Sequence, residues 1–168
     1  MTPTDTAAPT TQVYRIYIRA TPQQVWDAIT QPEYVAKYGY GGILEADLRP
    51  GGAMKIRASQ EFLDAGAPDV IVDGEILEAD PPRKLVQTWR MLMDPTMAEE
   101  GFTRLTHEIA EVPHAGVRLT VTHELENAPA LAAMVAGTQE DSGAGGGWAW
   151  ILSDLKSLLE TGDRIATS

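Results

Sequence analysis

The chain has 168 residues, which suffices for one domain with a hydrophobic core, and its apolar content of 43% is ordinary for a globular protein. It contains no cysteine, which excludes disulfides, thiolate zinc sites and a cysteine nucleophile. The net charge of -11 disfavours binding to nucleic acids and to anionic lipid surfaces, so neither is expected as a partner.

The start of the chain is polar and lacks the cationic and apolar regions of a signal peptide. We therefore expect a disordered lead over residues 1–12, a single domain over residues 13–162 and a disordered tail over residues 163–168. No apolar run approaches the ~20 residues that a membrane-spanning helix needs. This predicts a cytoplasmic protein without membrane insertion.

The first expected elements are a strand and two short helices. Residues 13–20 alternate in the way that strand residues do. Thr21 and Gln24 then have the spacing of a capping box, which predicts the start of a short helix. A second short helix is expected at residues 33–38, before a glycine-rich aromatic loop at residues 39–42.

Beyond this loop the apolar period drops to two, which predicts further strands. Short turns rich in glycine and proline separate them, and consecutive strands with short links form an antiparallel meander. A short helix is also expected at residues 130–136. The expected strands span residues 43–49, 53–63, 70–79, 84–92, 103–112 and 116–125.

The last turns of the chain carry one apolar stripe at three- and four-residue spacing, which indicates a long amphipathic helix. Gly162 stands where a helix-ending left-handed residue is expected. The stripe consists of Trp148, Ile151, Leu152, Leu155, Leu158 and Leu159. We therefore expect an α+β fold in which a curved, antiparallel, seven-stranded sheet wraps around this helix and leaves a ligand cavity between them.

Two histidines lie on the apolar faces of neighbouring expected strands. His107 alternates with Leu105, and His123 alternates with Leu119 and Val121. If a three-residue loop joins the strands, His107 lies directly opposite His123, with Cβ atoms about 4.5–5.5 Å apart. Such a pair would transfer protons, hydrogen-bond a ligand or hold a metal, although a histidine on an apolar face is more often a core residue. No third metal ligand stands at a diagnostic spacing, so we predict no metal and no cofactor.

Aromatic and amide side chains form a second group of candidates, because flat, partly oxygenated ligands suit aromatic faces with a polar tip. Tyr38 and Tyr40 are expected at the entrance, whereas Gln60 and Gln87 are expected to be buried polar groups that orient a ligand. Core packing is the commoner role for the buried tryptophans and methionines. The candidate ligand-binding residues are Trp26, Tyr38, Tyr40, Met54, Ile56, Gln60, Gln87, Trp89, Met91, Leu105, His107, Leu119, Val121, His123, Trp148, Leu152 and Leu155.

Five segments carry a family resemblance, at residues 19–30, 48–52, 80–89, 119–124 and 147–162. In this order the chain resembles the helix-grip fold of the SRPBCC or START-like superfamily. Within that group it is similar to the branch related to the C-terminal domain of the heat-shock ATPase activator. The resemblance implies a cavity for a hydrophobic small molecule. Relatives include lipid carriers, hormone receptors, polyketide aromatase/cyclases and co-chaperones, so the fold alone does not give the function.

Three hypotheses follow from these observations. The first is a protein that binds or sequesters a hydrophobic small molecule, with aromatic compounds among the candidates, as a monomer or a weak homodimer. The second is an enzyme of the cyclase/aromatase or hydrolase type, with His107 and His123 as candidate acid–base groups. No nucleophile elbow, HExxH motif or phosphate-binding loop supports that second hypothesis. The third is a co-chaperone-like module that binds another protein.

Overall fold

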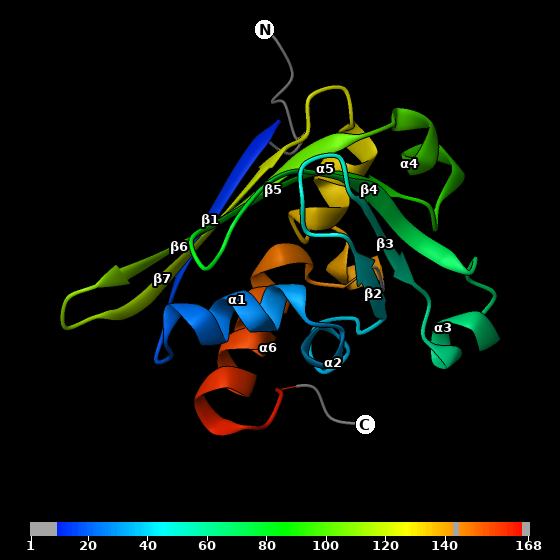
Figure 1. Ribbon diagram of the computed structural model, residues 1–168. Helices are drawn as coiled ribbons and strands as arrows, with labels where there is room; N and C mark the ends of the chain where they lie inside the picture. The colour runs from blue at the N-terminus through cyan, green and yellow to red at the C-terminus, as the bar shows by residue number, and fades with distance from the viewer. Residues whose placement is uncertain (1–9, 143–144, 166–168) are drawn as a thin grey trace, which may run out of the picture.

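The computed structural model describes residues 10–142 and 145–165. Seven strands form one antiparallel sheet in the order β1-β7-β6-β5-β4-β3-β2, so the chain meanders from β2 to β7 and β1 adds to the edge beside β7. The sheet curves over the helices, as Figure 1 shows. The strands are β1 (Thr11–Ile18), β2 (Ile43–Ala46), β3 (Ala53–Arg57), β4 (Val70–Asp80), β5 (Lys84–Met91), β6 (Thr103–Val112) and β7 (Gly116–Glu124).

The longest helix, α6 (Gly147–Thr161), lies on the concave side of the sheet and contacts β1, α1 and α5 (Figure 1). No helix in the part of the chain that the structure describes is long and apolar enough to cross a membrane. The shorter helices are α1 (Pro22–Thr30), α2 (Pro32–Val35), α3 (Gln60–Asp64), α4 (Pro95–Glu100), α5 (Pro129–Val135) and the 3₁₀ turn η1 (Glu140–Ser142). The predicted α+β helix-grip architecture is thus confirmed.

Helix ends agree with the local sequence signals. Thr21 Oγ1 accepts a hydrogen bond of 3.1 Å from Gln24 N, and Gln24 Oε1 accepts one of 2.8 Å from Thr21 N, which completes the predicted capping box. Gly162 ends α6 with a φ of 83°, and its N–H donates to the carbonyl of Leu158. Only glycine adopts this left-handed conformation without strain.

The strand predicted over residues 53–63 was wrong in its second half. β3 ends at Arg57, and the side chain of Ser59 accepts a hydrogen bond from Phe62 N and begins α3. A serine at an N-cap satisfies a free helical N–H, and this local bond stops the strand alternation. The helix α4 was not predicted, although Asp94 caps it through Thr96 N and Met97 N in the same way.

The ends of the domain also differ from the expected boundaries. Thr11 and Gln12 belong to β1, and Gln12 Nε2 donates to the carbonyl of Ala132 at 2.9 Å. The rest of the expected disordered lead, apart from Thr10, lies outside the described residues. At the other end Arg164 and Ile165 contact α6, while residues 166–168 lie outside the described part.

Candidate ligand-binding cavity

A cavity of about 650 Å³ lies between the concave face of strands β2–β6 and the first turns of α6. Helices α1 to α5 and the loop at residues 39–41 complete its wall. Most lining side chains are apolar, and no lysine or arginine is among the described residues that line it. Protein interiors are normally packed with few voids larger than a water molecule, so a space of this size is suited to a ligand.

The structure separates the predicted site residues into two sets. Gln60 belongs to neither, because it lies on α3, where its exposed side chain donates to Asp64 Oδ1 at 2.8 Å. The set that lines the cavity is Tyr38, Tyr40, Met54, Ile56, Gln87, Trp89, Met91, Leu105, His107 and Trp148. The set buried in the core away from the cavity is Trp26, Leu119, Val121, His123, Leu152 and Leu155.

Several lining residues were not among the candidates. These residues belong to short helices and not to the sheet: Met97 lies on α4, Phe62 on α3 and Met134 on α5. The Asp94-Pro95 pair was an available signal for α4, because aspartate at an N-cap followed by proline at the first position is a common helix start. No comparable signal indicates which of these helices covers the cavity.

The two histidines lie on the same face of the sheet, but they are not opposite each other. Val112 pairs with Gly116 across the turn, so His107 pairs with Val121 and His123 pairs with Leu105. The predicted direct pairing was therefore wrong by two residues, and the histidines are diagonal neighbours. The three-residue loop that the prediction assumed is present, but it begins one residue earlier than the prediction required. Gly116 resumes the strand with a φ of 80°.

His123 has both ring nitrogens occupied. It is fully buried between two indole rings, and Trp148 Nε1 donates to its Nδ1 at 3.1 Å. Since Nδ1 accepts, the neutral ring carries its proton on Nε2, which lies 2.8 Å from Thr103 Oγ1. The Thr103 hydroxyl in turn donates to the carbonyl of Trp89 at 2.8 Å. Every donor in this chain has an acceptor, which makes His123 a structural residue.

Burial lowers the pKa of His123 to about 3, with a smaller contribution from His107. A proton added at this ring would have no acceptor at Nδ1, because Trp148 Nε1 donates there. His123 therefore stays neutral at physiological pH and cannot act as a general acid.

His107 is different, because its Nδ1 is buried without a hydrogen-bond partner among the described residues. The side chain is 8% exposed, lines the cavity and meets Trp148 edge-to-face with ring centroids 6.1 Å apart. Burial lowers the pKa of His107 to about 4, so the ring is neutral at pH 7. A neutral imidazole has one donor and one acceptor nitrogen, both suited to a hydroxyl or carbonyl group.

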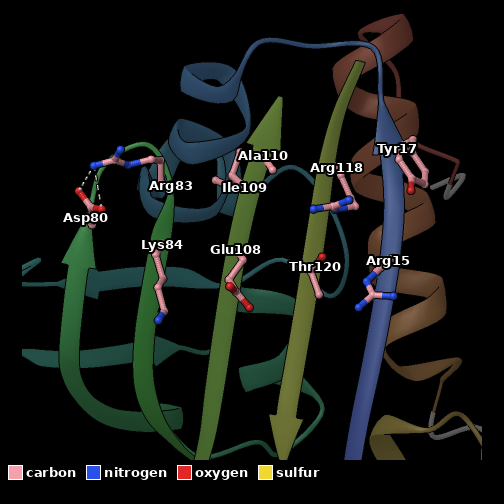
Figure 2. Close-up of a pocket in the computed structure, with 10 residues that line it drawn as sticks. All are labelled: Arg15, Tyr17, Asp80, Arg83, Lys84, Glu108, Ile109, Ala110, Arg118 and Thr120. Carbon is pink, nitrogen blue, oxygen red and sulfur yellow. Dashed lines mark hydrogen bonds and ion pairs between the residues drawn. The ribbon is translucent and has the colours of Figure 1, made fainter. Parts of the chain in front are cut away.

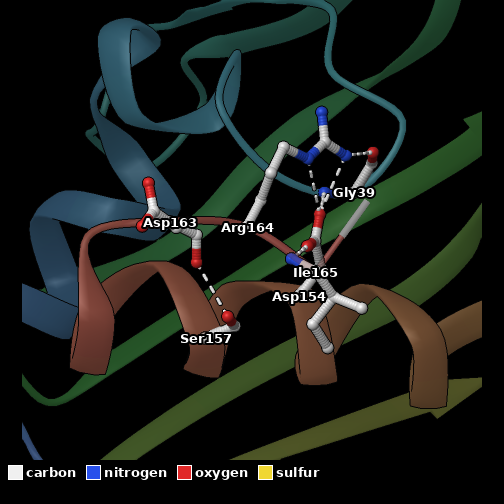
Figure 3. Close-up of polar contacts among 6 residues, drawn as sticks. All are labelled: Gly39, Asp154, Ser157, Asp163, Arg164 and Ile165. Carbon is white, nitrogen blue, oxygen red and sulfur yellow. Dashed lines mark hydrogen bonds and ion pairs between the residues drawn. The ribbon is translucent and has the colours of Figure 1, made fainter. Parts of the chain in front are cut away.

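A buried ion pair holds the loop at the cavity wall. Asp154 of α6 is 0% exposed, and its carboxylate accepts from Gly39 N at 2.9 Å, from Ile165 N at 2.6 Å and from the Arg164 guanidinium at 2.8 Å. Arg164 also donates to the carbonyl of Gly39 at 2.6 Å, so one side chain bridges loop and helix (Figure 3). The arrangement fixes residues 39–41, which line the cavity, against α6.

Tyr40 follows this anchor and packs on the first turn of α6. Its ring lies 5.1 Å from that of Trp150, with an angle of 30° between the planes. Gly145 lies so close that a Cβ at this position would collide with the Tyr40 hydroxyl, and its φ of 87° is a second reason for glycine there. Tyr38 lies deeper, and its hydroxyl donates to the carbonyl of Ala28 at 3.0 Å.

A second hollow of about 610 Å³ lies on the outer face of the sheet (Figure 2). Lys84, Glu108, Thr120 and Arg15 form one row across β5, β6, β7 and β1, since each pairs with the next in register. Their side chains point away from the face that carries His107. This hollow is open and charged, so it does not share the apolar character of the inner cavity. No group of three or more potential metal ligands occurs among the residues described.

Comparison with known proteins agrees with this architecture. Residues 19–160 match the family of Activator of Hsp90 ATPase homolog 1-like proteins. No curated protein matches the sequence significantly.

Solved structures with the same fold include protein MLL2253 from Mesorhizobium loti, with 22% identity, a TM-score of 0.64, and coverage of 89% of this chain and 96% of that one. The Aha1 dimer from Colwellia psychrerythraea has 18% identity, a TM-score of 0.62, and coverage of 90% and 97%. DynU16, a putative protein in the dynemicin biosynthetic locus, has 21% identity, a TM-score of 0.64, and coverage of 93% and 49%. At these identities the likeness shows the fold alone, whereas the match over residues 19–160 shows that the chain belongs to the family of Activator of Hsp90 ATPase homolog 1-like proteins.

Proposed function

We propose that this protein binds a hydrophobic small molecule in the cavity between the sheet and α6. The observation that carries this proposal is the apolar cavity of about 650 Å³, which His107 lines with a ring whose buried Nδ1 has no partner among the described residues. Natural ligand sites have this composition, with a mostly apolar lining and a few polar groups that orient the ligand. A cytoplasmic location and a monomeric or weakly dimeric state belong to the same proposal.

Apolar burial supplies the driving force for such binding. A ligand that removes about 300 Å² of apolar surface from water gains roughly 7 kcal/mol, at about 25 cal/mol per Å². Part of this gain offsets the lost translational and rotational freedom of the ligand. A gain of roughly 7 kcal/mol alone corresponds to a dissociation constant of about 10 µM, so values weaker than this are expected for a flat hydrocarbon probe.

A pair of matched variants tests where such a probe binds. Ala46 lies on β2 and lines the inner cavity, whereas Ala110 lies on β6 and lines the outer hollow. Ala46→Phe fills space in the cavity and is expected to weaken binding of pyrene at least tenfold. Ala110→Phe adds the same group to the outer face and should leave the affinity within twofold of wild type. Equal affinities in both variants, or no pyrene binding by the wild type, would contradict the proposal.

An enzyme with acid–base chemistry is the second candidate, and His107 is the observation that favours it. His123 makes hydrogen bonds through both ring nitrogens, so only His107 remains available to a substrate in the cavity. With a pKa of about 4, its neutral ring can accept a proton in a transition state. The acid–base function would be supported if the His107→Gln variant still bound a poly-β-ketone substrate but no longer cyclised it. Unchanged turnover in that variant would remove it.

A further inference from the structure

We infer that the cavity takes an electrically neutral ligand with one hydroxyl or carbonyl oxygen, which hydrogen-bonds to His107. This inference rests on the proposed binding function and narrows the chemical class of the ligand. It combines three features of the wall: the charges that line it, the imidazole ring of His107, and a second polar side chain beside that ring.

The charges of the wall favour a neutral ligand. Asp94 is the charged residue among the described lining groups, and its carboxylate is engaged as the N-cap of α4. The two lining tyrosines are neutral at pH 7, and burial raises the pKa of both Tyr38 and Tyr40 further. A carboxylate or phosphate that entered the cavity would lose its hydration without gaining a cation. Ionised fatty acids and phosphorylated compounds are therefore disfavoured.

His107 requires a hydrogen-bond partner that the described part of the chain does not provide. Its sheet partners, Leu85 and Val121, have no polar side-chain atoms. The nearby indole N–H of Trp148 is already used, because it donates to His123 Nδ1 at 3.1 Å. Buried polar groups are normally paired, and the 8% of His107 that stays exposed belongs to a residue of the cavity wall. A ring without a protein partner in this wall points to a partner on the ligand.

Gln87 places a second polar side chain next to His107. On the neighbouring strand Gln87 pairs with Leu105, two residues from His107, so the two side chains are diagonal neighbours on one face. Gln87 is buried and also lines the cavity. Trp89 and Trp148, which line the same part, offer aromatic surface to a flat ring system. A planar apolar molecule with one oxygen at its edge fits this combination.

Three probes of nearly the same shape test the inference: pyrene, 1-hydroxypyrene and 1-pyrenecarboxylate. Their dissociation constants are measured at pH 7 by energy transfer from tryptophan, on wild type, His107→Leu, Gln87→Leu and the surface control His114→Asn. His114 is exposed in the β6–β7 turn with a φ of 62°, a conformation that asparagine tolerates. The ratio of the pyrene constant to the hydroxypyrene constant isolates the oxygen contact from apolar burial.

Wild type and His114→Asn are expected to bind the carboxylate at least tenfold more weakly than 1-hydroxypyrene. In His107→Leu the ratio of the pyrene to the 1-hydroxypyrene dissociation constant should fall about fivefold, while pyrene itself still binds. Gln87→Leu should lower this ratio less. If all three probes bind equally well, or the carboxylate binds best, the inference is wrong and the binding function stands. An unchanged ratio in a folded His107→Leu variant overturns it as well. If no probe binds the wild type, the proposed function fails with it.

Discussion

Trp148 and His123 are joined by a hydrogen bond of 3.1 Å that connects the first turn of α6 to the last part of β7. Further hydrogen bonds lead from His123 through Thr103 to the carbonyl of Trp89. Four residues from α6, β7, β6 and β5 thus form one chain of hydrogen bonds. His107, two residues from the sheet partner of His123, is outside this chain. The two histidines thus share a face but have opposite energetic roles.

Replacing the two histidines by leucine should change stability in opposite directions. His123→Leu removes the hydrogen-bond partner of the Trp148 N–H and one of the partners of the Thr103 hydroxyl. The free energy of unfolding is expected to fall by about 2–4 kcal/mol. His107→Leu removes an unpartnered buried nitrogen and is expected to be neutral or stabilising by up to about 1 kcal/mol. Urea denaturation measures both values. Equal losses in the two variants would mean that His107 is as firmly bonded as His123.

The stability of the ligand-free protein should fall as the pH is lowered from about 6.5 towards 4. Burial holds the pKa of His107 at about 4 and that of His123 at about 3, whereas both titrate near 6.5 in the unfolded chain. Between these folded and unfolded pKa values the unfolded state binds more protons than the folded state. For two groups, the free energy of unfolding therefore falls by up to about 2.7 kcal/mol for each unit by which the pH is lowered.

Urea titrations between pH 5 and 7 measure this slope above the range where most carboxylates titrate. His107→Leu removes one of the two groups, so its slope near pH 5 should be about half that of wild type. His114→Asn, which replaces an exposed histidine, should follow the wild-type curve. A wild-type stability that is flat across this range would show that the two rings take up protons in the folded state as readily as in the unfolded chain.

Part of this site follows from local sequence rules, and part does not. Thr21 and Gln24, only three positions apart, define a helix start that needs no knowledge of the rest of the fold. The period of two in β6 and β7 likewise places His107 and His123 on the inner face. Their diagonal offset depends on where the turn begins. The last pair before the turn is Val112 with Gly116, one residue earlier than expected, and this places His107 opposite Val121 instead of His123.

Longer-range features were not accessible from the pattern. Gln60 continues the alternation of β3 in sequence, but the cap formed by Ser59 redirects the chain into α3. The contact between Arg164 and the Gly39 carbonyl joins segments 125 residues apart, and no local period indicates it. The free nitrogen of His107 also depends on what its neighbours on other strands and on α6 provide.

The ion pair between Arg164 and Asp154 should be worth more than an ordinary surface pair. Arg164→Met removes the guanidinium partner of a fully buried carboxylate, and the expected loss of stability is about 1–3 kcal/mol, since the arginine itself is partly exposed. Amide hydrogen exchange at residues 39–41 should also become faster, because Arg164 no longer bonds the Gly39 carbonyl.

The matched control for this substitution is Arg83→Met. Arg83 forms its ion pair with Asp80 at 3.1 Å on the surface, where both side chains are exposed, so the change should cost less than about 0.5 kcal/mol. Equal effects of the two substitutions, with unchanged exchange at residues 39–41, would mean that Arg164 does not hold the loop.

The most direct test of ligand binding in the cavity uses the indole N–H signals of the four tryptophans in ¹H–¹⁵N spectra during a titration with 1-hydroxypyrene. Trp89 and Trp148 line the cavity, Trp26 is buried away from it, and Trp150 packs against Tyr40. We predict saturable shifts for the signals of Trp89 and Trp148, with that of Trp26 unmoved. Saturation without any shift at Trp89 and Trp148, or no response from any indole, would contradict binding in this cavity.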